Sequence, residues 1–236
     1  MAVPLTMVAH MLGTAAAVMV LVWCIHFRGG LAFKATNKYL IFNIHPVLTL
    51  IGVIILGGEA IICHKSVPFS KGVKKFIHLT LHAFALILGI VGTYAAFKFH
   101  NESSIPNLFS FHSWMGIGVI CLYGIQWIVG FLAFFYPGGS AGVRAQSLSP
   151  HVIFGLFLYI LAVATALLGF LEKLTFLENS DVARYGTEAY FVNFTAVVTV
   201  LFGVSIVLTA ISPPRATTVA EEPDKSDIEF FGTRKK

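Results

Sequence analysis

The chain has 236 residues, of which 57% are hydrophobic and 11% are charged, and its formal net charge is +5. Soluble domains carry about 25% charged residues, so this composition excludes an ordinary soluble fold and predicts a protein whose surface is largely covered by lipid. The basic residues lie in short clusters between apolar runs, which argues against a nucleic-acid-binding surface.

Six apolar stretches are long enough to cross a bilayer as helices, because a hydrocarbon core about 30 Å thick needs roughly 20 residues of helix. The expected spans are residues 8–27, 40–62, 76–97, 112–135, 151–171 and 190–211. Turn-forming residues separate them, and Pro150 is expected to end the connection into the fifth span. We therefore expect an all-α membrane protein with a six-span domain over residues 1–212 and a disordered cytoplasmic tail over residues 213–236.

The distribution of basic residues bears on the orientation in the membrane. With six spans, both termini share one side with the second-to-third and fourth-to-fifth connections. Lys71, Lys74 and Lys75 lie in the first of these connections, although the two sides otherwise carry nearly equal numbers of basic residues. Because positive charge favours the cytoplasm, the termini are expected there.

Histidines begin four consecutive spans: His45 the second, His78 the third, His112 the fourth and His151 the fifth. Since consecutive spans run in opposite directions, His45 and His112 share one face of the membrane, while His78 and His151 share the other. A low-spin haem iron takes two axial imidazoles, and a four-helix bundle has room for the porphyrin. The pattern predicts two b-type haems in a bundle of the second to fifth spans, one near each membrane face.

Alternatives remain open at this stage. His82 follows His78 by one helical turn and lies on the same helix face, so either residue suits the ligand role. A histidine near the end of a span can also be a plain interfacial residue, and a haem-free, proton-coupled transporter with a histidine relay is the alternative function.

Several other classes of site are disfavoured by missing motifs. The three cysteines, Cys24, Cys63 and Cys121, are widely spaced and form no CxxC pair, which argues against a disulfide scaffold or a structural zinc site. No strand followed by GxGxxG occurs, so a ferric reductase core fed by its own flavin or nicotinamide module is also disfavoured.

Over about residues 8–212, the chain resembles the cytochrome b561 family of ascorbate-dependent transmembrane oxidoreductases, with the character of a plant member. The motifs that carry the resemblance are FNIHP at 42–46, KKFIH at 74–78, FKFHN at 97–101, FHSWMG at 111–116, SPH at 149–151 and ATALLG at 164–169. The resemblance implies haem ligation by His45 with His112 on the non-cytoplasmic side and by His78 with His151 on the cytoplasmic side. It favours His78 over His82.

The resemblance also implies a function and its setting. Electrons would pass from cytoplasmic ascorbate through two haem b groups to a non-cytoplasmic acceptor, either monodehydroascorbate or a ferric chelate. A homodimer is implied, in the vacuolar membrane by preference or else in the plasma membrane.

Basic residues near the inner histidine pair are candidates for binding ascorbate, which is a monoanion near neutral pH. Lys71, Lys75 and Arg144 lie in the two connections that flank His78 and His151, and fixed positive charge there would attract the anion. The plainer interpretation is that such residues anchor the protein at the membrane interface, and we prefer it for Lys74.

The best candidate for the non-cytoplasmic substrate site is His100, which lies in the third-to-fourth connection and is expected to contact substrate and exchange its proton. Phe99 and Asn107 are expected beside it. The loop that follows carries one acid, Glu102, and no cysteine, so any ferric iron is expected to arrive as a chelate.

Overall fold

The structure is a computed structural model that describes residues 4–213. Six helices are long and apolar enough to cross a membrane. They are Leu5–Phe27, Tyr39–Ser66, Lys71–Glu102, Phe111–Phe134, Ala141–Glu178 and Thr187–Ile211. No β-strand occurs among residues 4–213, and the expected all-α membrane fold is confirmed. The tail expected over residues 213–236 lies outside the described residues, apart from Pro213.

The first two spans contain irregular segments, whereas the other four are single helices. The first span consists of α1 (Leu5–Val22) and the π-helical turn η1 (Trp23–Phe27). The second consists of α2 (Tyr39–Phe42), α3 (Ile44–Thr49), the π-helical η2 (Leu50–Leu56) and α4 (Gly57–Ser66). The single helices are α5 (Lys71–Glu102), α6 (Phe111–Phe134), α7 (Ala141–Glu178) and α8 (Thr187–Ile211).

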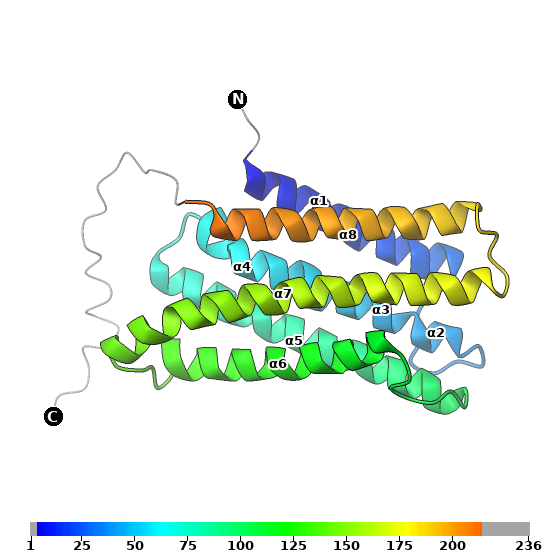
Figure 1. The fold of residues 1–236 in the computed structure, drawn as a ribbon, viewed down its shortest axis with the longest axis horizontal. Coiled ribbons are helices and arrows are strands. Elements are labelled where there is room, and N and C mark those ends of the chain that lie inside the picture. Colours follow the sequence, from blue (N-terminus) through cyan, green and yellow to red (C-terminus); the bar gives the residue numbers. More distant parts are fainter. Residues whose placement is uncertain (1–3, 214–236) are drawn as a thin grey trace.

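The second span, α5, α6 and α7 form a four-helix bundle in which each helix packs on the next and α7 closes the ring against η2. The helices α1 and α8 pack on each other and cover the second span and α7 (Figure 1). Phe202 of α8 joins these two layers, because its buried ring occupies space beside Gly13 and Gly58 that a side chain at either glycine would fill. The bundle interior is thus enclosed by helices on all sides.

Glycines let the second span approach α5 closely. A Cβ atom on Gly52 would lie 2.6 Å from the Cβ of Leu88, and one on Gly89 would lie 2.7 Å from Cγ2 of Val53. Both distances are shorter than van der Waals contact, so a side chain at either position would push the helices apart. Small residues serve this purpose widely where membrane helices cross.

Serine caps determine where three long helices begin. The hydroxyl groups of Ser70, Ser110 and Ser140 each accept a hydrogen bond from the backbone N–H three residues later. The fifth span therefore begins at Ala141, and the expectation that Pro150 ends the preceding connection is wrong. Pro150 lies inside α7, where it removes one helical hydrogen bond, a loss that membrane helices tolerate.

The helices α5 and α7 extend well beyond the bilayer core. They have 32 and 38 residues, so at 1.5 Å per residue they are about 48 Å and about 57 Å long. A hydrocarbon core of about 30 Å covers only part of each. Hydropathy marks that part alone, which is why the expected spans end inside the actual helices.

Candidate functional site

The four candidate ligand histidines form two pairs at opposite ends of the four-helix bundle. His45 on α3 and His112 on α6 have ring centroids 6.0 Å apart, at the end away from the termini. His78 on α5 and His151 on α7 have centroids 6.2 Å apart, at the end where α5 and α7 begin (Figure 1). The structure therefore brings together the same pairs that the alternating directions of the spans indicated.

The separation within each pair suits two axial ligands on one metal ion. An imidazole nitrogen lies about 2 Å from a transition metal that it coordinates. Adding the distance from ring centre to nitrogen on both sides places two axial imidazoles roughly 6 Å apart, centre to centre. The 6.0 Å and 6.2 Å separations agree with this value, so the residues present fit an iron porphyrin held at either pair.

Three of the four rings are oriented by a backbone carbonyl on a neighbouring helix. The Nδ1 contacts are His45 with the Gly92 oxygen at 3.1 Å, His112 with the Thr165 oxygen at 2.9 Å and His78 with the Ala60 oxygen at 2.8 Å. A carbonyl only accepts hydrogen bonds, so Nδ1 carries the proton in each case. Nε2 then keeps its lone pair, as metal coordination requires.

The fourth ring, that of His151, contacts a side-chain amide. Nε2 of Gln126 lies 3.0 Å from Nδ1 of His151 and donates to the His151 carbonyl at 2.8 Å. The two ends of an amide are assigned from their hydrogen bonds. The contact with the carbonyl fixes the amide NH2 on this side, so the amide donates at both contacts and Nδ1 of His151 is the acceptor. Among residues 4–213, Gln126 is the side chain that contacts Nδ1 of a candidate ligand.

Two glycines lie against the histidines of α6 and α7. A Cβ atom on Gly169 of α7 would lie 2.7 Å from Cε1 of His112, and one on Gly130 of α6 would lie 3.0 Å from Cε1 of His151. Each helix therefore offers a histidine to its own pair and a glycine to the histidine of the other helix. A side chain at either glycine would displace an imidazole.

The sequence contains a signal for these glycines that residue-by-residue analysis missed. Gly130 follows His112 by eighteen positions, and Gly169 follows His151 by eighteen. Eighteen residues make about five turns of 3.6 residues, so histidine and glycine lie on the same helix face. In two antiparallel neighbours, this spacing places each glycine level with the other helix's histidine.

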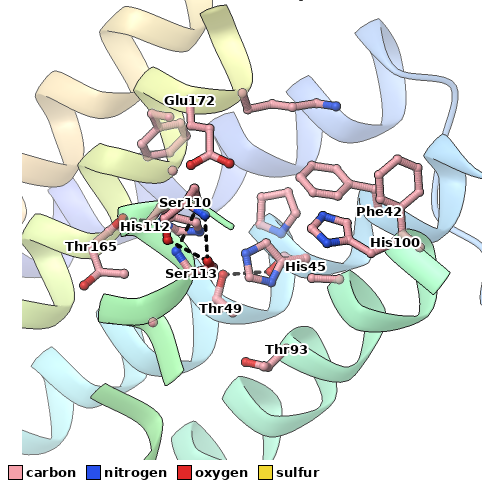
Figure 2. A pocket seen from close by; sticks show the side chains of 18 of the residues that line it. Phe42, His45, Thr49, Thr93, His100, Ser110, His112, Ser113, Thr165 and Glu172 are labelled. Atoms are coloured by element: carbon pink, nitrogen blue, oxygen red, sulfur yellow. Dashed lines mark hydrogen bonds between the residues drawn. The ribbon is translucent and has the colours of Figure 1, made fainter. Parts of the chain in front are cut away.

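A cavity of about 500 Å³ adjoins the pair formed by His45 and His112. Figure 2 shows both rings at its wall, together with His100 and Glu172. Most of the remaining lining is apolar or aromatic, including Phe42. The cavity thus continues from the outer histidine pair to His100. This residue lies in the last turn of α5, and the expectation that it lies in the following connection is wrong.

The residues expected at the non-cytoplasmic substrate site, His100, Phe99 and Asn107, all line this cavity. The ring of His100 stacks on Phe109, with centroids 6.0 Å apart. Asn107 is exposed and donates to the side-chain oxygen of Asn101 at 2.7 Å. Phe99 is buried and packs in the cavity wall.

The residues expected to bind ascorbate lie at the opposite end of the bundle. Lys71 and Lys75 are exposed one turn apart at the start of α5, and neither has an ion pair within residues 4–213. Arg144 is exposed in the first turn of α7 and donates to the Gly139 carbonyl at 2.8 Å. These three cations share the end of the bundle that holds His78.

His82 makes contacts different from those of His78. Its ring centroid lies 4.4 Å from that of His78, and its Nδ1 is hydrogen-bonded to the hydroxyl group of Tyr123. His78 is the residue whose ring lies 6.2 Å from His151. His82 therefore lies beside His78, with Tyr123 as its hydrogen-bond partner, and His78 remains the ring opposite His151. No motif in the sequence marked Tyr123.

A second use of His78 is geometrically possible. One donor atom each of Cys63, His64 and His78 lies within 4.8 Å of the others, and all three cysteines of the chain are free. A metal ion there would occupy the same imidazole as a haem bound between His78 and His151. The two uses exclude each other, and the facing rings favour the haem.

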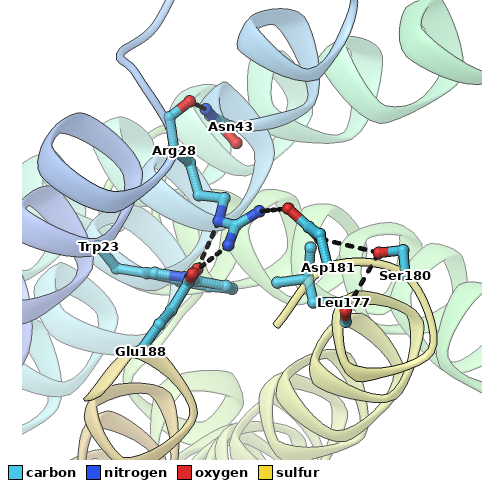
Figure 3. A network of polar contacts seen from close by, with 7 residues as sticks. All are labelled: Trp23, Arg28, Asn43, Leu177, Ser180, Asp181 and Glu188. Carbon is cyan, nitrogen blue, oxygen red and sulfur yellow. Dashed lines mark hydrogen bonds and ion pairs between the residues drawn. The ribbon is translucent and has the colours of Figure 1, made fainter. Parts of the chain in front are cut away.

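A polar network joins the connections near the outer pair (Figure 3). Arg28 donates to both carboxylate oxygens of Glu188 and lies 3.6 Å from Asp181, while Trp23 also donates to Glu188, at 2.9 Å. The backbone carbonyl of Arg28 accepts from Asn43 at 3.1 Å. Burial alone would lower the pKa of Arg28, but the hydrogen bond and charge of Glu188 raise it above its usual value.

Comparison with known proteins gives concordant results. A family model described as eukaryotic cytochrome b561 matches residues 44–177. The chain is 65% identical over 223 residues to the probable ascorbate-specific transmembrane electron transporter 1 of Oryza sativa subsp. japonica, covering 94% of each chain. It is 64% identical over 209 residues to transmembrane ascorbate ferrireductase 1 of Arabidopsis thaliana, covering 89% of this chain and 87% of the relative. A transmembrane ascorbate-dependent reductase of Mus musculus is 35% identical over 199 residues, covering 84% and 78%.

Proposed function

The chain belongs to the eukaryotic cytochrome b561 family, and on this premise we propose that two b-type haems are held by His45 with His112 and by His78 with His151. The protein is an integral membrane oxidoreductase that transfers electrons across the membrane from ascorbate. Its cofactor is b-type haem. The histidine-relay transporter is not retained, because the relatives are electron transporters and reductases.

The observation that carries the two-haem proposal is the presence of a facing imidazole pair at each end of one bundle, with centroids 6.0 Å and 6.2 Å apart. When bound, haem supplies one-electron chemistry, and two imidazole ligands leave no open position for oxygen. The protein contributes the position of each imidazole, the proton on Nδ1 of His45, His78 and His112, and an apolar interior.

On the donor side, we infer that Lys71, Lys75 and Arg144 bind ascorbate. Their exposed positive charges lie at the end of the bundle that holds His78 and are free to attract a monoanion. Ascorbate gives up one electron and one proton there and becomes monodehydroascorbate. The proton passes to water, because this end of the bundle is exposed.

On the acceptor side, His100 is proposed to contact the substrate at the mouth of the cavity, with Asn107 beside it and Phe99 in the wall. A monodehydroascorbate acceptor takes up one electron and one proton to become ascorbate. The imidazole of His100 supplies that proton and regains one from the adjoining water. A ferric chelate would take the electron alone.

The setting in the cell is part of the proposal. The cluster of Lys71, Lys74 and Lys75 supports cytoplasmic termini, which makes the His100 side luminal or extracellular. The vacuolar membrane, with the plasma membrane as the alternative, and a homodimeric assembly follow from the family resemblance.

Spectra of the purified protein test the two-haem proposal. The pyridine haemochrome should give two haems b per chain, and ascorbate should reduce them. A His112→Ala variant should lose one haem and keep the other, as should His151→Ala, so the two variants should differ in the haem that remains. A single haem in the wild-type protein, or the same residual spectrum in both variants, would contradict the assignment.

A further inference from the structure

Lys173 lies on α7 and lines the cavity that also contains His45 and His100. Its Nζ lies 4.3 Å from the ring centroid of Phe42 and 5.0 Å from that of Tyr39. Aromatic faces attract cations, and these two hold the ammonium group at the cavity wall.

Two carboxylates at this end of the bundle are already engaged by another cation. Arg28 pairs with both Glu188 and Asp181 (Figure 3). Among residues 4–213, no carboxylate lies within 4.0 Å of Lys173 Nζ. Lys173 is thus a half-buried cation at the cavity wall that forms no ion pair within the described part of the chain.

Such an arrangement is costly unless something else supplies the negative charge. A desolvated ammonium is destabilised without a counter-ion, and aromatic faces offset only part of that loss. Glu172 is the preceding residue on the helix, but successive side chains point about 100° apart. Figure 2 shows its carboxylate inside the cavity, so an incoming anion would bind on the Lys173 side and away from Glu172.

We propose that Lys173 binds an anionic oxygen of a molecule held in this cavity. The inference rests on the proposed function, which supplies two sources of that oxygen: a propionate of a haem bound by His45, and the anionic acceptor that reaches His100. Lys173 shares one cavity with His45 and His100. The ring of Phe42 adjoins both Lys173 and His45, because its centroid lies 4.3 Å from Lys173 Nζ and 5.9 Å from the centroid of His45.

The test uses purified, haem-loaded protein with three substitutions. Lys173→Gln removes the charge, Lys173→Arg keeps it, and Lys34→Gln removes an exposed charge from the same end of the bundle. Haem content, the midpoint potential of each haem and the KM for monodehydroascorbate during re-oxidation are measured for each. If Lys173→Gln yields too little protein, Lys173→Met keeps the apolar stem and replaces it.

A propionate partner predicts that Lys173→Gln favours the oxidised form of the outer haem by about tenfold, which is about 59 mV for a one-electron couple. An acceptor partner predicts a KM about tenfold higher with unchanged potentials. Lys173→Arg and Lys34→Gln should stay within about twofold of wild type in either case. Normal potentials together with a normal KM in Lys173→Gln would overturn the inference, whereas a wild-type protein without two haems would overturn the proposed function.

Discussion

The hydrogen bond at Nδ1 distinguishes one of the four candidate ligands from the others. His45, His78 and His112 donate to backbone carbonyls, which substitution does not change. His151 faces the side chain of Gln126. A stronger acceptor at Nδ1 makes an imidazole a better donor to the metal, so the inner pair can be tuned through a single side chain.

We therefore expect Gln126→Glu to lower the midpoint potential of the haem at His78 and His151. The carboxylate accepts from Nδ1–H as an anion and favours the ferric state, and each tenfold preference amounts to about 59 mV. Potentiometric titration measures the effect. Gln126→Leu, which offers no acceptor, serves as the comparison; equal potentials in both variants would show that the contact does not tune the ligand.

The ring of His112 lies so close to α7 that only glycine fits at position 169 without displacing it. In Gly169→Ala, the added methyl group would lie 2.7 Å from Cε1 of His112, so the imidazole must move, and overpacking of this kind costs about 1–3 kcal/mol. We expect loss or spectral change of the outer haem alone. Gly118→Ala is the matched control, because nothing lies within 4 Å of the added atom.

The proposed ascorbate site predicts a change in donor affinity. The double variant Lys75→Ala, Arg144→Ala should raise the KM for ascorbate roughly threefold to tenfold, because each exposed ion pair contributes up to about 1 kcal/mol. Haem content should not change. Lys74→Ala removes a charge that is expected to act only as an anchor, and it should leave the KM for ascorbate unaltered. An equal rise in this KM in both variants would show that Lys75 and Arg144 act only through the general positive charge of this surface.

At the scale of the elements, α6 and α7 are interdependent, since each contributes one histidine to one pair and one glycine to the other. Adding an alanine between Ile120 and Cys121 would rotate one half of α6 by about 100° relative to the other. We expect both haems to be affected, although the change lies in one helix. An alanine added between Ala183 and Arg184, in the fifth-to-sixth connection, should leave both spectra intact.

The pairing of the histidines could be predicted because it depends only on the number and direction of the spans. The ends of the helices could not, since polar residues after the Ser140 cap continue α7 through Pro150 outside the apolar run. Gly130 and Gly169 were overlooked for another reason. Their role depends on the alignment of two helices, and a single-helix pattern does not contain it.

At the scale of the whole molecule, the network around Arg28 ties the end of the first span to the connection between α7 and α8, through Asp181, and to the first turn of α8, through Glu188. Glu188→Gln should lower the apparent melting temperature by several degrees, because breaking a largely buried ion pair costs roughly 3 kcal/mol. Glu102→Gln disrupts the exposed pairs with Lys38 and Lys98, and it should have little effect on unfolding. Similar melting temperatures for both variants would contradict a structural role of the network.

The shared spacing of histidine and glycine on α6 and α7 also has a consequence when the protein resides in membranes of different thickness. Eighteen residues correspond to about 27 Å along a helix axis, and this length depends on the backbone alone. A thicker or thinner bilayer tilts helices or deforms the lipid around them, but it does not stretch a helix. The distance that an electron must travel between the two histidine pairs is therefore expected to stay the same when the protein passes from the thin membrane where it is synthesised to a thicker one.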